Sequence, residues 1–138
     1  MTVHDTRPRR STLLALLLGV ALASGGCAAE RSFRKAQDHE TSKHWDLAVM
    51  AYEKAASLEP ANKKYEAALF RARLQAAQTH LGRGRLHRSA GQLDLAKVEL
   101  EQSVALDATN DVALQELKRV SEEIEVRRRL SGTPASAR

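Results

Sequence analysis

The side chain best suited to covalent chemistry is that of Cys27, the only cysteine in the chain, which lies in the stretch ALASGGCAAE. A single thiol cannot form an internal disulfide. Its immediate sequence neighbours are glycine and alanine residues, which supply neither a base nor a cation to activate a catalytic nucleophile. The residues around Cys27 therefore indicate neither a disulfide nor a catalytic nucleophile.

Histidines are the remaining candidates for metal binding or proton transfer. His80 and His87 are seven residues apart on one face of a predicted helix, so about 10.5 Å separates them along the helix axis and one metal ion cannot bridge them. His39 and His44 fall on either side of a predicted turn. We expect these histidines to be solvated, and we expect no metal site, no cofactor and no catalytic residue.

Two other chemical signatures fail on inspection. The GRG at residues 82–84 lacks the preceding strand and the third glycine of a nucleotide-binding fingerprint. The chain also contains no G-x-S-x-G motif, in which serine would be a nucleophile. The sequence therefore predicts a protein that is not an enzyme.

The N-terminus has the pattern of an export signal. The first ten residues, MTVHDTRPRR, carry three arginines and one aspartate, and residues 13–23, LLALLLGVALA, are uncharged and apolar. As a helix this apolar run would be about 16 Å long, too short for a bilayer core of about 30 Å. We interpret residues 1–26 as a signal peptide. A permanent N-terminal transmembrane anchor is the alternative.

The residues SGGC, which end at Cys27, resemble a bacterial lipobox. In that motif small side chains precede a cysteine that receives a diacylglyceryl group and becomes the mature N-terminus. Ser24 departs from the pattern, which usually has leucine there. The resemblance implies an anchor of two or three acyl chains, enough for stable membrane attachment. Cleavage by an ordinary signal peptidase is the alternative, and it would leave an unpaired thiol in an oxidising compartment.

By resemblance to such lipoproteins, Ala28 after the cysteine favours the outer membrane, with the domain facing the periplasm; anchoring in the inner membrane is the alternative. The formal net charge is +5 for the whole chain, and loss of the three arginines and one aspartate of the leader would leave +3. With only two Phe, two Tyr and one Trp to stack on bases, we expect no nucleic-acid partner.

The body of the chain contains an internal repeat. Residues 46–62, DLAVMAYEKAASLEPAN, align with residues 94–110, DLAKVELEQSVALDATN, at an offset of 48 residues, and the two segments share Asp, Leu, Ala, Glu, Leu and Asn at matching positions. Each copy has apolar residues at the spacing of one helix face. Repeats of this length predict a stack of helix pairs.

The first copy resembles a tetratricopeptide (TPR) repeat. Small residues that let two helices approach, a bulky residue between them and a terminal proline carry the resemblance. They are Ala48, Tyr52, Ala55 and Pro60 in the first copy, with Ala36 in the helix before it, and Ala96 and Leu100 in the second copy, with Gly84 in the helix before it. The resemblance implies an all-α, TPR-like α-α superhelix of about five helices, in which two helix pairs with an elongated third helix are followed by a C-terminal capping helix.

Within a domain of residues 27–130, we place repeat 1 at about residues 29–62, repeat 2 at about 77–110 and the capping helix at 111–130. The offset exceeds the usual 34-residue repeat by 14 residues, and we assign the excess, about residues 63–76, to an elongation of the third helix, Lys63 to Ser89. Residues 131–138 are small and polar and are predicted to be a disordered tail.

In TPR domains the first helix of each pair lines a concave groove that binds partners. By this resemblance the predicted groove residues are Phe33, Gln37, Glu40, Gln78, Leu81, Arg85 and Arg88. Residues 63–88 carry seven basic side chains and one acidic one, whereas residues 94–125 carry nine acidic side chains and three basic ones. The basic helix could grip an acidic or extended partner segment. Alternatively, the basic and acidic helices simply face each other and solvent.

Taken together, these patterns predict a lipid-anchored adaptor or scaffold that binds protein partners during assembly of a cell-envelope complex. The layout resembles the small TPR lipoproteins that pilot secretins in type IV pilus and type II secretion systems, and the lipidated N-terminal module of some secretins. A self-associating structural lipoprotein without a specific client is the alternative, and a homo-oligomer is possible.

Overall fold

The computed structural model describes residues 27–132. The signal peptide predicted for residues 1–26, and residues 133–138 of the predicted tail, lie outside this range. Within it, five helices and no strands are present: residues 27–41, α2 (Trp45–Leu58), α3 (Lys63–Ser89), α4 (Leu93–Leu106) and α5 (Asp111–Leu130). The predicted all-α, TPR-like fold with an elongated third helix is therefore confirmed.

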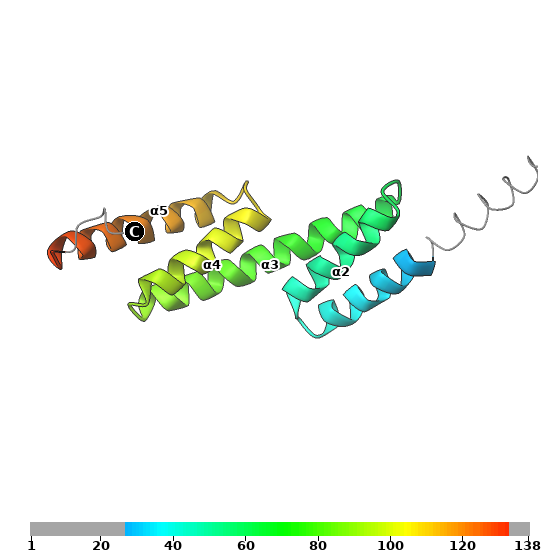
Figure 1. The fold of residues 1–138 in the computed structure, drawn as a ribbon, viewed down its shortest axis with the longest axis horizontal. Helices are drawn as coiled ribbons and strands as arrows, with labels where there is room; N and C mark the ends of the chain where they lie inside the picture. The colour runs from blue at the N-terminus through cyan, green and yellow to red at the C-terminus, as the bar shows by residue number, and fades with distance from the viewer. Residues whose placement is uncertain (1–26, 133–138) are drawn as a thin grey trace, which may run out of the picture.

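The long helix α3 connects two ends of an elongated molecule (Figure 1). The first helix and α2 pack against its N-terminal half. Helix α4 packs against its C-terminal half, and α5 packs mainly on α4. Two separate hydrophobic cores result. We call residues 27–76 the first unit and residues 77–130 the second unit.

The two units repeat one another in register at the 48-residue offset. Helices α2 and α4 have equivalent bounds, and each follows a turn that places a residue at positive φ, Lys43 at 58° and Gly91 at 73°. The next helix begins in both units after an asparagine N-cap: the side chain of Asn62 accepts a hydrogen bond from the amide of Lys64, and that of Asn110 from the amide of Ala113.

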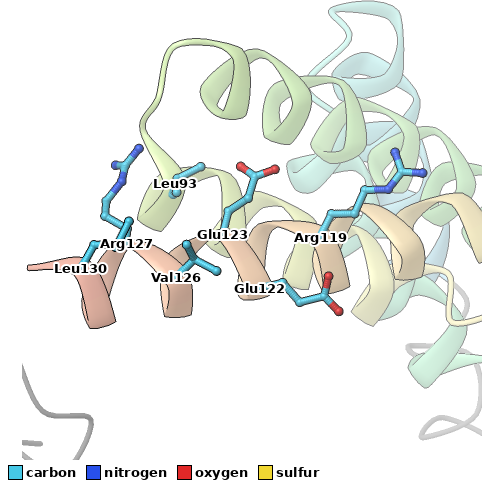
Figure 2. Close-up of a pocket in the computed structure, with 7 residues that line it drawn as sticks. All are labelled: Leu93, Arg119, Glu122, Glu123, Val126, Arg127 and Leu130. Carbon is cyan, nitrogen blue, oxygen red and sulfur yellow. The ribbon is translucent and has the colours of Figure 1, made fainter.

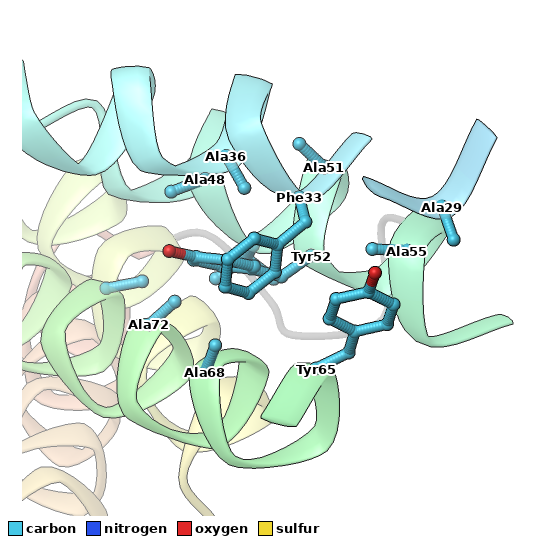
Figure 3. Packing of buried hydrophobic residues seen from close by; sticks show 12 residues of the cluster. Ala29, Phe33, Ala36, Ala48, Ala51, Tyr52, Ala55, Tyr65, Ala68 and Ala72 are labelled. Atoms are coloured by element: carbon cyan, nitrogen blue, oxygen red, sulfur yellow. The ribbon is translucent and has the colours of Figure 1, made fainter. Parts of the chain in front are cut away.

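Small side chains allow close helix packing in both cores. In the first unit, Ala36, Ala48 and Ala55 are fully buried around Tyr52 (Figure 3). In the second, Gly84 lies so close to the fully buried Leu100 that a Cβ added to the glycine would be 2.7 Å from Leu100 Cγ. Ala96 is also fully buried, whereas Pro60 is exposed just after the end of α2.

The extra 14 residues, about 63–76, form the third helical segment of the first unit, which was not predicted from the sequence. The first half of α3 closes the first unit with Tyr65, Ala68 and Ala72, and α5 closes the second unit with Ala113 and Val120, which are 48 residues after Tyr65 and Ala72. Each unit is therefore a bundle of three helical segments. Helix α3 supplies the last segment of one unit and the first segment of the next.

Candidate functional site

Two of the predicted groove residues lie in the core. Phe33 is 4% exposed, and its ring centroid is 5.0 Å from that of Tyr65 and 5.3 Å from that of Tyr52 (Figure 3). Leu81, 48 residues later, is 5% exposed in the second core. The assignment of these two residues to an open groove was wrong, because the third segment of each unit covers the side of the helix on which they lie.

On the surface of the first unit, Gln37 is exposed and Glu40 is partly buried. The Tyr52 hydroxyl donates a hydrogen bond of 2.5 Å to the Glu40 carboxylate. Burial, and then this hydrogen bond, raise the pKa of Tyr52 well above its usual value of 10. Glu40 thus holds the hydroxyl end of the buried Tyr52 by a hydrogen bond near the surface of the first unit.

Two basic residues near the end of α3, Arg85 and Arg88, contact acidic residues of α5. Arg88 donates a hydrogen bond of 3.1 Å to Glu116 and a second one to Glu123, and Arg85 lies 3.4 Å from Glu116. The hydrogen bond to Glu123 raises the pKa of Arg88. These contacts favour the interpretation in which the basic and acidic helices face each other. Gln78 is exposed on the same helix. The predicted groove residues are therefore divided between two units.

The expectation that His80 is solvated was wrong, because this histidine lies in a polar cluster between two helices. His80 is 9% exposed, with Nε2 3.0 Å from Asp46 Oδ1 on α2 and Nδ1 2.7 Å from Glu99 Oε2 on α4. Both ring nitrogens can donate to these carboxylates only when the imidazole carries two protons. Asp46 belongs to the first unit and Glu99 to the second, so His80 joins the two units. Across residues 27–132, no group of three or more His, Cys, Asp or Glu side chains is placed to hold a metal ion.

A groove of about 510 Å³ lies at the far end of the second unit (Figure 2). The residues that line this C-terminal groove are Leu93, Arg119, Glu122, Glu123, Val126, Arg127 and Leu130. Val126 is 56% exposed and Leu130 is 84% exposed. Arg127 donates a hydrogen bond of 3.2 Å to the carbonyl of Gly91, which ties the end of α5 to the turn before α4. Apolar side chains here are surrounded by charges of both signs.

Cys27 lies at the opposite end of the molecule, in the first turn of the first helix, and is exposed. Among the helices of residues 27–132, none has both the length and the hydrophobicity needed to cross a membrane.

Comparison with known proteins gives one similar structure. No protein-family model matches the chain, and no curated protein matches it. The TPR domain of Arabidopsis OM64 is similar at 22% sequence identity and a TM-score of 0.35, over 71% of this chain and 98% of that domain. The TPR-like fold described above is seen in the packing of the helix pairs, and proteins of this class commonly serve as modules for protein–protein interaction.

Proposed function

We propose that the protein is a lipid-anchored adaptor that binds protein partners during assembly of a bacterial cell-envelope complex. A type IV pilus or a type II secretion secretin is the complex that the sequence resemblance favours. The anchor would be the diacylglyceryl group on Cys27, and the domain would face the periplasm from the outer membrane.

The C-terminal groove carries the proposal. The last element of a helical repeat array normally has a polar outer face, because no further repeat covers it. Helix α5 instead leaves Val126 and Leu130 exposed beside Leu93. An apolar centre with a charged rim is the usual composition of a protein interface. We infer that another polypeptide covers this groove.

The position of the groove suits an adaptor. Figure 1 places the first turn of the first helix and the end of α5 at opposite ends of the long axis. A lipid on Cys27 would therefore attach one end of the molecule to the membrane, and the C-terminal groove would lie at the other end.

Photo-crosslinking in the native bacterium tests the groove. A photoreactive amino acid at Val126 in the full chain is expected to crosslink to a different envelope protein, whereas the same group at Gln75, an exposed residue in the middle of α3, is expected not to. A product containing two copies of this chain would instead support the self-associating structural lipoprotein. Equal products from both positions, or none from either, would contradict an interface at the groove.

Metabolic labelling tests the anchor separately. A palmitate analogue is expected to label the wild-type chain and not the Cys27→Ser variant. Label on both chains, or on neither, would remove the anchor from the proposal and leave the groove to be judged by its own crosslinks.

A further inference from the structure

The outer side of the first helix and α2 forms a hollow that we call the N-terminal face. It is lined by Arg31, Ser32, Lys35, His39, Leu47, Met50, Ala51 and Lys54. Met50 is 64% exposed and Leu47 is 46% exposed. The lining includes no acidic residue. Arg31, Lys35 and Lys54 also take part in none of the ion pairs found within residues 27–132.

The second unit shows that the fold does not require these charges. At the positions 48 residues later, the apolar pair is kept as Leu95 and Val98, both about half exposed. The basic residues are not kept. Thr79 takes the place of Arg31, Gln102 that of Lys54 and Glu99 that of Ala51, and only Lys35 has a basic counterpart, Arg83. Helices α2 and α4 have equivalent bounds, and most of the buried positions of the first unit are also buried in the second, in spite of this difference. The fold therefore forms without the basic residues of the N-terminal face.

The N-terminal face lies beside Cys27. Arg31 and Lys35 follow Cys27 by four and eight residues on the first helix, which corresponds to about 6 and 12 Å along the axis. Arg31 also lines a neighbouring hollow together with Cys27 itself. Any lipid attached to Cys27 would bring this face within reach of the bilayer surface.

We propose that the N-terminal face rests on a membrane surface that contains anionic phospholipids, so that the first helix and α2 lie along the bilayer. This inference rests on the lipid anchor proposed above. Exposed Leu47 and Met50 can enter the headgroup region, while the flanking basic side chains keep their charges among the phosphates. Each Lys or Arg near an anionic surface strengthens binding by about 1 kcal/mol, or about fivefold.

An acidic protein segment could also match the charge of this face. The observations favour lipid, because the basic residues begin about one helical turn after Cys27. The equivalent face farther from Cys27 keeps only one of the three, as Arg83. In vesicles that contain no other protein, the two alternatives make different predictions.

The experiment uses the full chain, processed in the bacterium, purified in detergent and reconstituted into phosphatidylcholine vesicles with or without phosphatidylglycerol. A fluorophore is attached at Met50→Cys or, as a matched control, at the equivalent position of the second unit, Val98→Cys. Nitroxide groups on the lipids quench fluorophores that touch the bilayer. We expect strong quenching at position 50 in phosphatidylglycerol vesicles and little at position 98.

A charge variant tests the stated cause. Arg31→Thr with Lys54→Gln copies the residues of the second unit and removes two basic side chains, so it is expected to reduce the population lying on the membrane about 25-fold and to lower quenching at position 50 to the level at position 98. Arg71→Thr with Arg83→Gln removes the same charge from exposed sites outside the face and should leave the quenching unchanged.

Failure of the anchor and failure of this inference are distinguishable. An intact mass without the lipid would exclude the anchor, and the inference would fall with it. A lipidated chain with equal quenching at positions 50 and 98 would overturn the inference alone, as expected if the face serves an acidic protein instead. Quenching that survives in Arg31→Thr with Lys54→Gln would also overturn it, because the contact would then not depend on charge.

Discussion

At the scale of single residues, two glycines of α3 have opposite surroundings. A Cβ on Gly84 would lie 2.7 Å from Leu100 Cγ and 3.3 Å from the carbonyl oxygen of Ala96, whereas a Cβ on Gly82 would meet nothing within 4 Å. Both alanine variants gain about 1 kcal/mol of helix propensity. Gly84→Ala adds the cost of an overpacked core, so we expect its free energy of unfolding to be about 2 kcal/mol below that of Gly82→Ala in urea denaturation. Equal stabilities would show that the core is loose at this point.

The residue at positive φ before α2, Lys43, is the basis of a second prediction about stability. Lys43 has the backbone conformation that Gly91 adopts in the equivalent turn, and a side chain in this region costs about 1 kcal/mol or more. Lys43→Gly should therefore raise the free energy of unfolding by about 1 kcal/mol. Lys43→Ala, which keeps the Cβ, should give no such gain. Thermal unfolding of the two variants and the wild type measures the difference.

The raised pKa of Tyr52 makes stability fall at high pH. A tyrosine in the unfolded chain ionises near pH 10, while in the folded protein burial and Glu40 keep the Tyr52 hydroxyl protonated. The unfolded state therefore binds fewer protons above pH 10, and the contribution of Tyr52, fully present below that pH, is lost at about 1.4 kcal/mol per pH unit as the pH rises.

Tyr52→Phe isolates this effect, because it removes the titrating group and keeps the ring. The stability difference between the wild type and Tyr52→Phe should be constant from about pH 7 to 9 and should shrink above about pH 10. A difference that stays constant to about pH 11 would contradict the protonated, hydrogen-bonded hydroxyl.

Individual packing residues were more predictable than individual surface residues. Ala48, Tyr52 and Ala96 occupy helix positions at which the size of the side chain decides how closely two helices pack, so local spacing indicates them. The partners of His80 are 34 and 19 residues away, on different helices, and local spacing carries no signal for such a cluster. Phe33 was wrongly predicted to line a groove, because it is buried against Tyr65. Tyr65 belongs to residues 63–76, which we had interpreted only as an elongation of the third helix.

At the scale of elements, α3 and α5 both begin after an asparagine N-cap, which is a signal present in the local sequence. The division of α3 between two cores did not follow from such a signal. The apolar residues of α3 pack against the helices before it in one half and against the helices after it in the other half. The helix therefore has no single apolar face that the sequence pattern could reveal. Only the packing shows that residues 63–76 correspond to the first part of α5.

The His80 cluster couples the two units, and its removal should uncouple them. His80→Ala leaves Asp46 and Glu99 without their shared partner, so we expect the free energy of unfolding to fall by about 1–3 kcal/mol. Trp45, the only tryptophan, packs against the first core and reports on the first unit, whereas far-UV circular dichroism reports on all helices. The two urea transitions should coincide in the wild type and separate in His80→Ala.

A second histidine provides the control for this experiment. His87 contacts Gln92 within the second unit, so His87→Ala removes an imidazole without touching the boundary between units. Its two transitions should remain coincident. Coincident transitions in His80→Ala would mean that the continuous helix alone keeps the units cooperative.

At the scale of the whole molecule, the sequence predicted which helices make up the fold. It did not predict the grooves and charged faces on the surface of the molecule. Whether an exposed apolar residue such as Val126 belongs to a groove depends on the relative placement of α4 and α5. The charge difference between the equivalent faces of the two units likewise becomes visible only when the 48-residue register is extended to complete helices. A single chain of two repeats gives too few copies to reveal such differences by alignment alone.

The uninterrupted helix α3 also sets the angle at which the two ends of the molecule point. Each residue inserted near its midpoint would rotate one end against the other by about 100° and lengthen the molecule by about 1.5 Å. A single insertion would therefore turn the C-terminal groove a quarter of the way around the long axis relative to Cys27. Insertions of seven or eleven residues would bring the two back within about 20° of alignment while increasing their separation by about 10 or 16 Å. If that angle matters for assembly, length variants among natural relatives should be spaced by these increments rather than by single residues.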